Sequence, residues 1–220
     1  MKLIGMLDSP YVRRAAVSLQ LLGVPFEHRS LSVFRAFDEF RRLSPVVKAP
    51  SLVFDDGSVL LDSTLIIDYA EALAAPGRSL MPSEPEARRR ALCCIGLALA
   101  ACEKSVQIVY ERNRPAERQH APWIERVQGQ MLAALAGLEA EVARGSIAAP
   151  RAGTIDQAGV TTAVVWRFVE AMMPGVVDPG AYPRMVAFAA EAERLPAFVA
   201  APHGDATIDP AISRAAAGRG

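Results

Sequence analysis

A hydroxyl residue stands between a short apolar run and a helix-forming segment. Lys2–Met6 has the composition of a buried strand, and Ser9 precedes the helical pattern Pro10–Leu22, whose first residue is a proline. Serine and proline at these positions also favour any ordinary helix start, so a plain N-cap is the simpler interpretation. The functional alternative is that unpaired N–H groups and partial positive charge at that helix end let Ser9 hold an anion, such as a thiolate.

A second candidate is the segment Lys48-Ala49-Pro50, which comes just before a short β-rich run. A proline that opens a strand is often only an edge residue. The alternative is a cis Ala49–Pro50 bond, which would leave the Ala49 N–H and C=O free for a peptide-like ligand, as in β-strand addition. Only about 5–6% of X–Pro bonds in folded proteins are cis, so the local sequence alone favours trans.

The third candidate is Asp62-Ser63, which follows a β-rich run and begins a helical one. Either residue can be an ordinary helix cap. A carboxylate and a hydroxyl at one helix start can also bind an ammonium and a carboxylate together, with Asp62 taking the ammonium and Ser63 the carboxylate. A γ-glutamyl group presents that pair.

The elements that must position these residues alternate between strand and helix up to about residue 79. The pattern predicts the order β-α-β-α-β-β-α, with a hairpin turn at Asp55-Asp56-Gly57. The expected strands are Lys2–Met6, Phe26–Ser30, Ser51–Phe54 and Val59–Leu61, and the expected helices are Pro10–Leu22, Phe37–Leu43 and Ser63–Ala74. We therefore expect an α/β domain over residues 1–79.

The sequence pattern predicts helices for the remainder of the chain. A breaker-rich linker, Ala75–Pro85, precedes two long segments whose apolar residues recur at steps of three and four, Ala87–Arg112 and the one containing Ile124–Val142. A turn at Asn113–Pro115 joins them, and Asp156–Met172, Tyr182–Glu193 and Leu195–Ala201 follow. We expect an all-helical domain over 86–203 and a flexible tail over 204–220.

Composition excludes several classes of function. Lys plus Arg and Asp plus Glu are both 24, so the chain lacks the positive charge expected of a binder of nucleic acid or anionic membranes. The three histidines, His28, His120 and His203, are far apart and predict no metal site. Cys93, Cys94 and Cys102 form no Cys-x-x-Cys pair, and we expect them to be small buried side chains. The acid at Asp8 interrupts any export signal, so we expect a cytoplasmic protein.

Taken together, Ser9-Pro10, Lys48-Ala49-Pro50 and Asp62-Ser63 resemble the glutathione S-transferase family. The opening looks like that of bacterial serine-type members, on the stretches Lys2–Met6, Ser9–Arg14 and Leu21–Glu27. The resemblance covers nearly the whole chain and implies a thioredoxin-like fold for the α/β domain. With Ser9 in place of a cysteine, and Val12 three residues on, a disulfide reductase is not expected.

The resemblance implies glutathione as the co-substrate and no metal. Ser9 would be the catalytic residue, donating a hydrogen bond to the glutathione thiolate, with Pro10 beside it. Lys48 would approach the glycyl carboxylate, and the backbone of Ala49, before a cis Pro50, would pair with the cysteinyl unit. Asp62, where the family more often has glutamate, would hold the γ-glutamyl end together with Ser63.

The electrophile pocket and the assembly are also expectations from this resemblance. Tyr11, Tyr110, Arg114 and Trp123 are candidates for the pocket, although packing at a helix end and turn is the simpler interpretation of the last three. Arg13 and Arg14 are expected at the surface or in dimer contacts, since family members are usually homodimers.

Two functions of different class remain. The first is a glutathione-dependent transferase that activates the thiolate for attack on a small hydrophobic electrophile, as in detoxification. The second is a non-catalytic glutathione-binding protein, or a stress-related protein–protein interaction module, on the same scaffold. The scaffold alone does not choose between them.

Overall fold

The computed structural model describes residues 1–209 and residue 211, and the chain forms two compact units. Unit 1 consists of Met1–Leu80 together with Arg194–Gly220, and unit 2 consists of Met81–Glu193. Unit 1 is a mixed α/β structure and unit 2 is helical, which confirms the predicted fold class.

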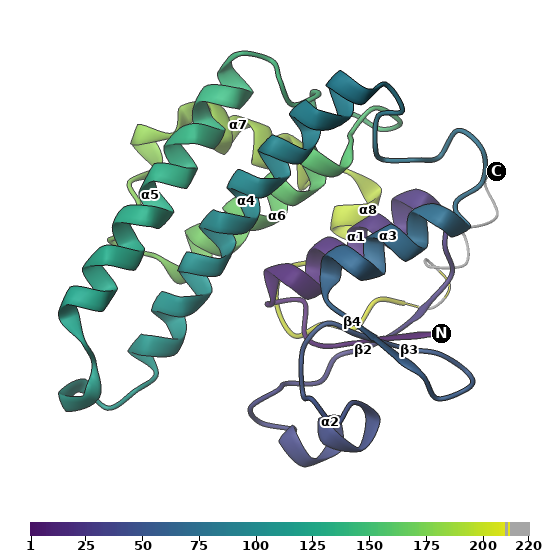
Figure 1. Cartoon of the computed structure of the whole chain (residues 1–220), viewed down its shortest axis with the longest axis horizontal. Helices are drawn as coiled ribbons and strands as arrows, with labels where there is room; N and C mark the ends of the chain where they lie inside the picture. Colours follow the sequence, from purple (N-terminus) through teal and green to yellow (C-terminus); the bar gives the residue numbers. More distant parts are fainter. Residues whose placement is uncertain (210, 212–220) are drawn as a thin grey trace. The chain divides into compact units, whose positions relative to one another are not determined.

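Unit 1 is built on a four-stranded sheet in the order β2-β1-β3-β4. β1 pairs in parallel with β2, and the other two pairs are antiparallel. Helices α1 and α3 lie side by side on one face, and α2 lies on the other side of the sheet (Figure 1). The strands are β1 (Lys2–Ile4), β2 (Glu27–Arg29), β3 (Ser51–Val53) and β4 (Val59–Leu61), and the helices are α1 (Pro10–Leu22), α2 (Phe37–Leu43), α3 (Ser63–Leu73) and α8 (Pro196–Val199).

The register of the sheet brings three chain segments to one edge. Ile4 pairs with Ser51, and Ser51 pairs with Leu61. The end of β1, the start of β3 and the end of β4 are therefore neighbours. The residues that follow β1, precede β3 and follow β4 must emerge together from that edge.

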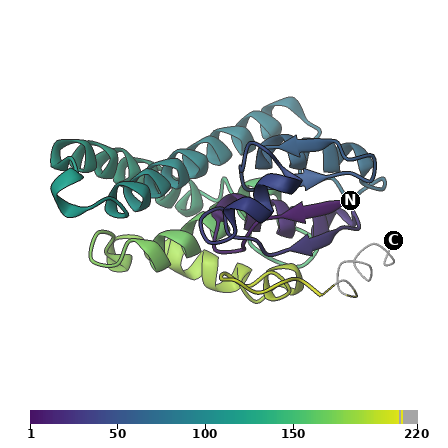
Figure 2. The ribbon, with the colours of Figure 1, turned by 90° about the horizontal axis from the view of Figure 1, so that it is seen from below.

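The end of the chain differs from the expectation. Within the described residues, the segment from Arg194 to Asp209 belongs to unit 1, although the sequence analysis placed it up to residue 203 in the helical domain. The Arg13 guanidinium donates to the Ala201 carbonyl oxygen at 2.7 Å, and the Ile208 N–H donates to His28 Nδ1 at 3.1 Å. Phe198 and Ile208 are buried there, so the segment contributes apolar side chains to the core of unit 1. Figure 2 shows the yellow segment after α8 beside the strands of the sheet.

The flexible tail predicted over 204–220 lies partly outside the described residues, which lack 210 and 212–220. Within the described part, residues 204–209 are hydrogen-bonded to unit 1 at β2 and the residue after it. The Ser30 hydroxyl donates to the Asp205 carbonyl oxygen at 2.8 Å, and Ile208 is buried beside His28.

Unit 2 is organised around a long helix, α4, which packs against both α5 and α6, while α7 packs on α5 and α6. The helices are α4 (Pro85–Arg112), α5 (Ala121–Ala143), α6 (Gln157–Met172) and α7 (Pro183–Ala192), with 3-10 turns at Ala116–Arg118 and Pro179–Ala181. In the described part of the chain, α4 alone is long and apolar enough to cross a membrane by length and composition. A core helix of a soluble protein passes the same test, so this is weak evidence of a span.

The three cysteines lie in α4 but not in equivalent surroundings. Cys94 and Cys102 are buried, as expected, whereas Cys93 is exposed, so the prediction of three buried thiols is wrong for Cys93. Burial raises the pKa of the Cys94 thiol to about 11, and the Glu141 and Asp156 carboxylates act in the same direction.

Candidate functional site

Ser9 caps α1 in the manner of an ordinary N-cap and still keeps its proton for another partner. Its Oγ accepts a hydrogen bond from the Val12 N–H at 3.4 Å, and Pro10 occupies the first helical turn. A hydroxyl that accepts one bond retains its own O–H as a donor. The capping interpretation and the catalytic one are therefore compatible.

Gly5 brings the start of α1 close to the loop before β3. Its φ is +137°, and a Cβ at this position would lie 2.6 Å from Val12 Cγ2 and 3.1 Å from the Ala49 Cβ. Only glycine permits this close approach without displacing its neighbours. The sequence analysis did not single out Gly5, although a glycine at the end of a strand pattern is a known sign of close backbone approach.

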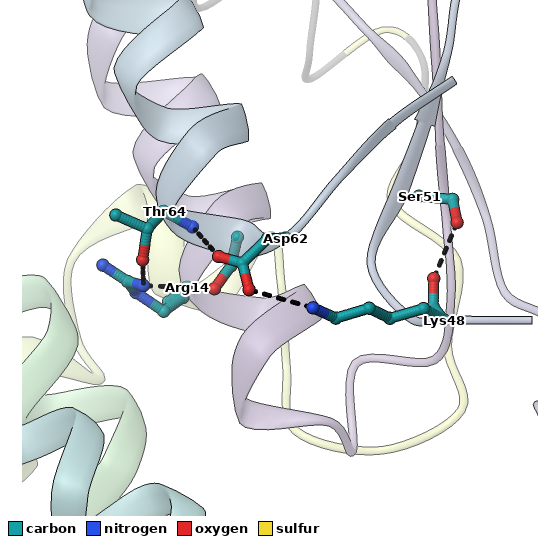
Figure 3. Close-up of polar contacts among 6 residues, drawn as sticks. Arg14, Lys48, Ser51, Asp62 and Thr64 are labelled. Carbon is teal, nitrogen blue, oxygen red and sulfur yellow. Dashed lines mark hydrogen bonds and ion pairs between the residues drawn. The ribbon is translucent and has the colours of Figure 1, made fainter. Parts of the chain in front are cut away.

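The loop before β3 has the predicted cis bond between Ala49 and Pro50. The Ser51 hydroxyl donates to the Lys48 carbonyl oxygen at 2.6 Å (Figure 3). It also lies 2.9 Å from the Ser44 hydroxyl. These bonds hold the loop against the start of β3. The Lys48 side chain extends away from the loop and is itself about half exposed.

Asp62 caps α3 and pairs with Lys48. One carboxylate oxygen accepts from the Thr64 N–H at 2.9 Å, and the other accepts from Lys48 Nζ at 3.0 Å (Figure 3). Partial burial raises the pKa of the Asp62 carboxyl, but the Thr64 N–H, the Lys48 ammonium and the Arg14 guanidinium outweigh it and hold the pKa below its usual value. The resemblance assigned Lys48 and Asp62 to opposite ends of glutathione and did not anticipate this pair.

Arg13 and Arg14 are not at the surface of unit 1, and that prediction is wrong. They are 0% and 1% exposed. Arg13 binds Ala201 and lies over the Phe198 ring, while Arg14 Nη1 donates to Ser63 Oγ and Thr64 Oγ1, both at 3.1 Å. The missed signal is that α1 carries apolar residues all round, so its charged residues have no exposed face to occupy.

An acid flanks Ser9 on its other side. Partial burial raises the pKa of the Asp8 carboxyl, although the charges of His203 and Arg35 oppose this. The C-terminal segment of unit 1 therefore contributes His203 to the surroundings of the α1 start. Nothing in the sequence pattern indicated that long-range neighbour.

The electrophile-pocket candidates are divided between the two units. Tyr11 is half-buried in the first turn of α1, whereas Tyr110, Arg114 and Trp123 lie in unit 2. Tyr110 and Trp123 are exposed in this chain. The Glu111 carboxylate accepts from Arg114 Nη1 at 3.3 Å and from the His120 N–H at 2.9 Å, so Arg114 helps to order the turn between α4 and α5. Their role toward an electrophile stays a prediction.

Among the residues that the structure describes, no group of three or more His, Cys, Asp or Glu side chains is placed to hold a metal ion. The polar groups gathered at the sheet edge are instead a hydroxyl at a helix start, a cis-proline loop and a carboxylate next to two hydroxyls. A thioredoxin-like unit that carries these groups, combined with a helical unit, is the two-domain class of protein that the sequence resemblance implied.

Comparison with known proteins gives the same class. Residues 3–79 match the model of the glutathione S-transferase N-terminal domain. The uncharacterized GST-like protein YibF of Escherichia coli (strain K12) is 28% identical over 148 residues, which cover 67% of this chain and 72% of that protein. The maleylacetoacetate isomerase of Pseudomonas aeruginosa is 30% identical over 148 residues, covering 61% of this chain and 68% of that protein.

A solved structure extends the match to almost the whole chain. A glutathione transferase family member from Pseudomonas fluorescens Pf-5, with bound glutathione, aligns with a TM-score of 0.79 and 28% identity over 92% of this chain and 98% of that chain. The chain belongs to the glutathione S-transferase family.

Proposed function

We propose that this protein is a glutathione-dependent transferase of the serine type, which activates the glutathione thiolate for attack on a small hydrophobic electrophile. The observation that carries the proposal is the convergence of Ser9, the cis Ala49–Pro50 loop and Asp62 at one edge of the sheet. The glutathione bound to the similar Pseudomonas fluorescens protein supports it.

In this proposal Ser9 acts on the acidity of the thiol. A free thiol has a pKa of about 8.5, and stabilising its thiolate a hundredfold takes roughly 2.7 kcal/mol. A hydrogen bond to a charged group contributes about 1.5–3 kcal/mol, and a helix N-terminus about 0.3–1 kcal/mol. The Ser9 hydroxyl and the α1 N-terminus together are therefore sufficient in size.

The reaction balances without a general base on the protein. With an aryl halide, the thiol proton goes to water, the thiolate sulfur forms a bond to the ring carbon, and the carbon–halogen bond breaks to release halide. One relative is named maleylacetoacetate isomerase, so isomerisation is a second class of reaction to assay with this protein.

The first experiment separates enzyme from binding module. Purified protein, glutathione and a reactive aryl halide should form the thioether faster than the same mixture without protein. Glutathione binding by calorimetry without any such acceleration would favour the non-catalytic alternative. Absence of glutathione binding would contradict both glutathione-dependent functions and leave the protein–protein interaction module.

A pH–rate profile tests the role of Ser9. Ser9→Ala should lower the rate at about pH 6.5 and move the midpoint of the profile to higher pH, with a smaller change in the KM for glutathione. Ser9 stabilises the thiolate and offers little to the neutral thiol, so the two effects should separate. Superimposable profiles for wild type and variant would mean that Ser9 is only a helix cap.

The remaining expectations are proposals of the same kind. We propose a cytoplasmic homodimer with its thiols reduced, acting on small molecules in detoxification, with neither nucleic acid nor membrane as a partner. The balanced charge of the chain supports the last point.

A further inference from the structure

A buried guanidinium lies beneath the start of α3. Arg14 comes from the second turn of α1, and its Nη1 carries two hydrogens. One goes to Ser63 Oγ and the other to Thr64 Oγ1, each at 3.1 Å (Figure 3). A single nitrogen therefore holds two neighbouring hydroxyls of the first turn of α3.

These two bonds fix the direction in which the Ser63 and Thr64 hydroxyls donate. Each hydroxyl has one hydrogen and two lone pairs. When a lone pair accepts from Arg14, the hydroxyl hydrogen has to point away from the guanidinium. The adjacent positive charge also polarises the O–H bond and makes it a better donor. Ser63 and Thr64 thus present donors, and the N-terminus of α3 adds its own preference for an anion.

Asp62 supplies the opposite charge immediately beside these donors. Its carboxylate is held by the Thr64 N–H and by Lys48, and stays available as an acceptor through its remaining lone pairs. Two oriented donors next to a fixed carboxylate match the zwitterionic end of an α-amino acid. The carboxylate of that group would meet Ser63 and Thr64, and its ammonium would meet Asp62.

We propose that Arg14 is a positioning residue that makes this subsite selective for the free α-carboxylate of glutathione. It acts through the Ser63 and Thr64 hydroxyls and does not touch the ligand. The inference rests on the proposed function, because it takes glutathione as the ligand. Without Arg14, both hydroxyls can rotate and act as acceptors toward the site, which disfavours a carboxylate there.

The test compares two ligands and several variants by calorimetry. The ligands are glutathione and γ-aminobutyryl-cysteinylglycine, which differs only in lacking the α-carboxylate. Wild type should prefer glutathione by roughly tenfold or more, the size expected for charge-assisted hydrogen bonds. Arg14→Gln should remove most of that preference by weakening glutathione alone. Arg14→Lys should keep part of it, because an ammonium retains the charge but lacks the planar fork.

Arg13→Lys is the matched control. Arg13 is as buried as Arg14 and adjacent to it in α1, but it binds the Ala201 carbonyl oxygen. This variant should lose stability and keep the preference for glutathione. Equal weakening of both ligands by Arg14→Gln would show a merely structural role and overturn the proposal.

Two further readouts keep the outcomes distinct. Wild type that binds glutathione without preferring it over the analogue would overturn this inference alone, whereas wild type that binds neither would overturn the proposed function too. If the Arg14 variants do not fold, Thr64→Val removes one of the polarised hydroxyls from an exposed position. Its preference for glutathione should fall several-fold, and an unchanged preference would overturn the proposal.

Discussion

Two charged side chains at the sheet edge are paired before any ligand is considered. Lys48 and Asp62 form an ion pair whose side chains are both about half exposed. Exposed pairs of this kind contribute little to stability, because water screens them and their side chains lose freedom. Their value lies in position, since Lys48 and the Thr64 N–H hold the Asp62 carboxylate at the start of α3, where the ammonium of the proposed ligand would arrive.

Asp62→Asn should weaken glutathione binding several-fold, and by the same factor at pH 5 and at pH 7.5. The pKa of the Asp62 carboxyl is held below its usual value. The carboxyl group is therefore ionised at both pH values and loses its charge only at lower pH. Calorimetry at the two pH values measures this. Asp68→Asn, an exposed position on α3, removes the same charge and should change little. A wild-type advantage that shrinks toward pH 5 would mean that the pKa is raised instead.

At the scale of the elements, Gly5 joins β1, α1 and the cis-proline loop. Gly5→Ala should cost roughly 1–3 kcal/mol of unfolding free energy, because the new methyl group overlaps Val12 and the backbone keeps a positive φ. It should also lower glutathione affinity by separating Ser9 from Ala49. Urea unfolding and calorimetry test the two effects. Gly57→Ala is the control, since it shares a positive φ but has open space for a Cβ, so affinity should survive.

The segment after α8 depends on a neutral histidine. His28 Nδ1 accepts from the Ile208 N–H, so Nε2 carries the proton and donates to the Gly5 carbonyl oxygen at 2.8 Å. Burial lowers the pKa of His28, although the bond to Gly5 acts in the opposite direction. The folded state therefore binds a proton less readily than the unfolded chain.

Stability should consequently fall as the pH drops through the ordinary histidine pKa, about 6.5, toward the lower pKa of the folded state. His28→Gln should flatten that part of the dependence between pH 7.5 and pH 5.5, as measured by urea unfolding. Hydrogen exchange should show the Ile208 amide losing protection first, because a protonated Nδ1 accepts no bond. An unchanged slope in the variant would assign the proton uptake to other groups.

Local signals predicted the elements, and long-range contacts escaped prediction. The expected helices Pro10–Leu22 and Phe37–Leu43 match α1 and α2. Local signals mark both ends of α1, with Ser9 and Pro10 at the start and Gly23 at the end, and Ser44-Pro45 marks the end of α2. The burial of Arg14 and the return of Ile208 to β2 depend on residues 49 and 180 positions away. The sequence pattern contains no signal for contacts between residues so far apart. The residue types of the site were therefore predictable, but the buried Arg14 and the C-terminal segment that support the site were not.

At the scale of the whole molecule, α3 is apolar on two sides. Ile66, Ile67 and Ala70 are buried within unit 1, whereas Leu65, Tyr69 and Leu73 are 55%, 38% and 47% exposed in the single chain. The exposed three are spaced by four residues and so form one stripe along the helix. Single exposed apolar residues are ordinary, but three aligned ones form the kind of surface that the proposed homodimer would bury. A second copy of this chain is the partner that the proposed homodimer supplies.

The stripe gives a direct test of that assembly. Wild type should sediment as a dimer at micromolar concentration, and Leu65→Glu combined with Leu73→Glu should sediment as a folded monomer, because two charges buried without partners would oppose association. Val199→Glu is the matched control, since Val199 is also an exposed apolar residue of unit 1 but lies on α8, away from the stripe, and this variant should remain dimeric. A monomeric wild type would contradict the proposed homodimer, and a dimeric double variant would place the interface elsewhere on the chain.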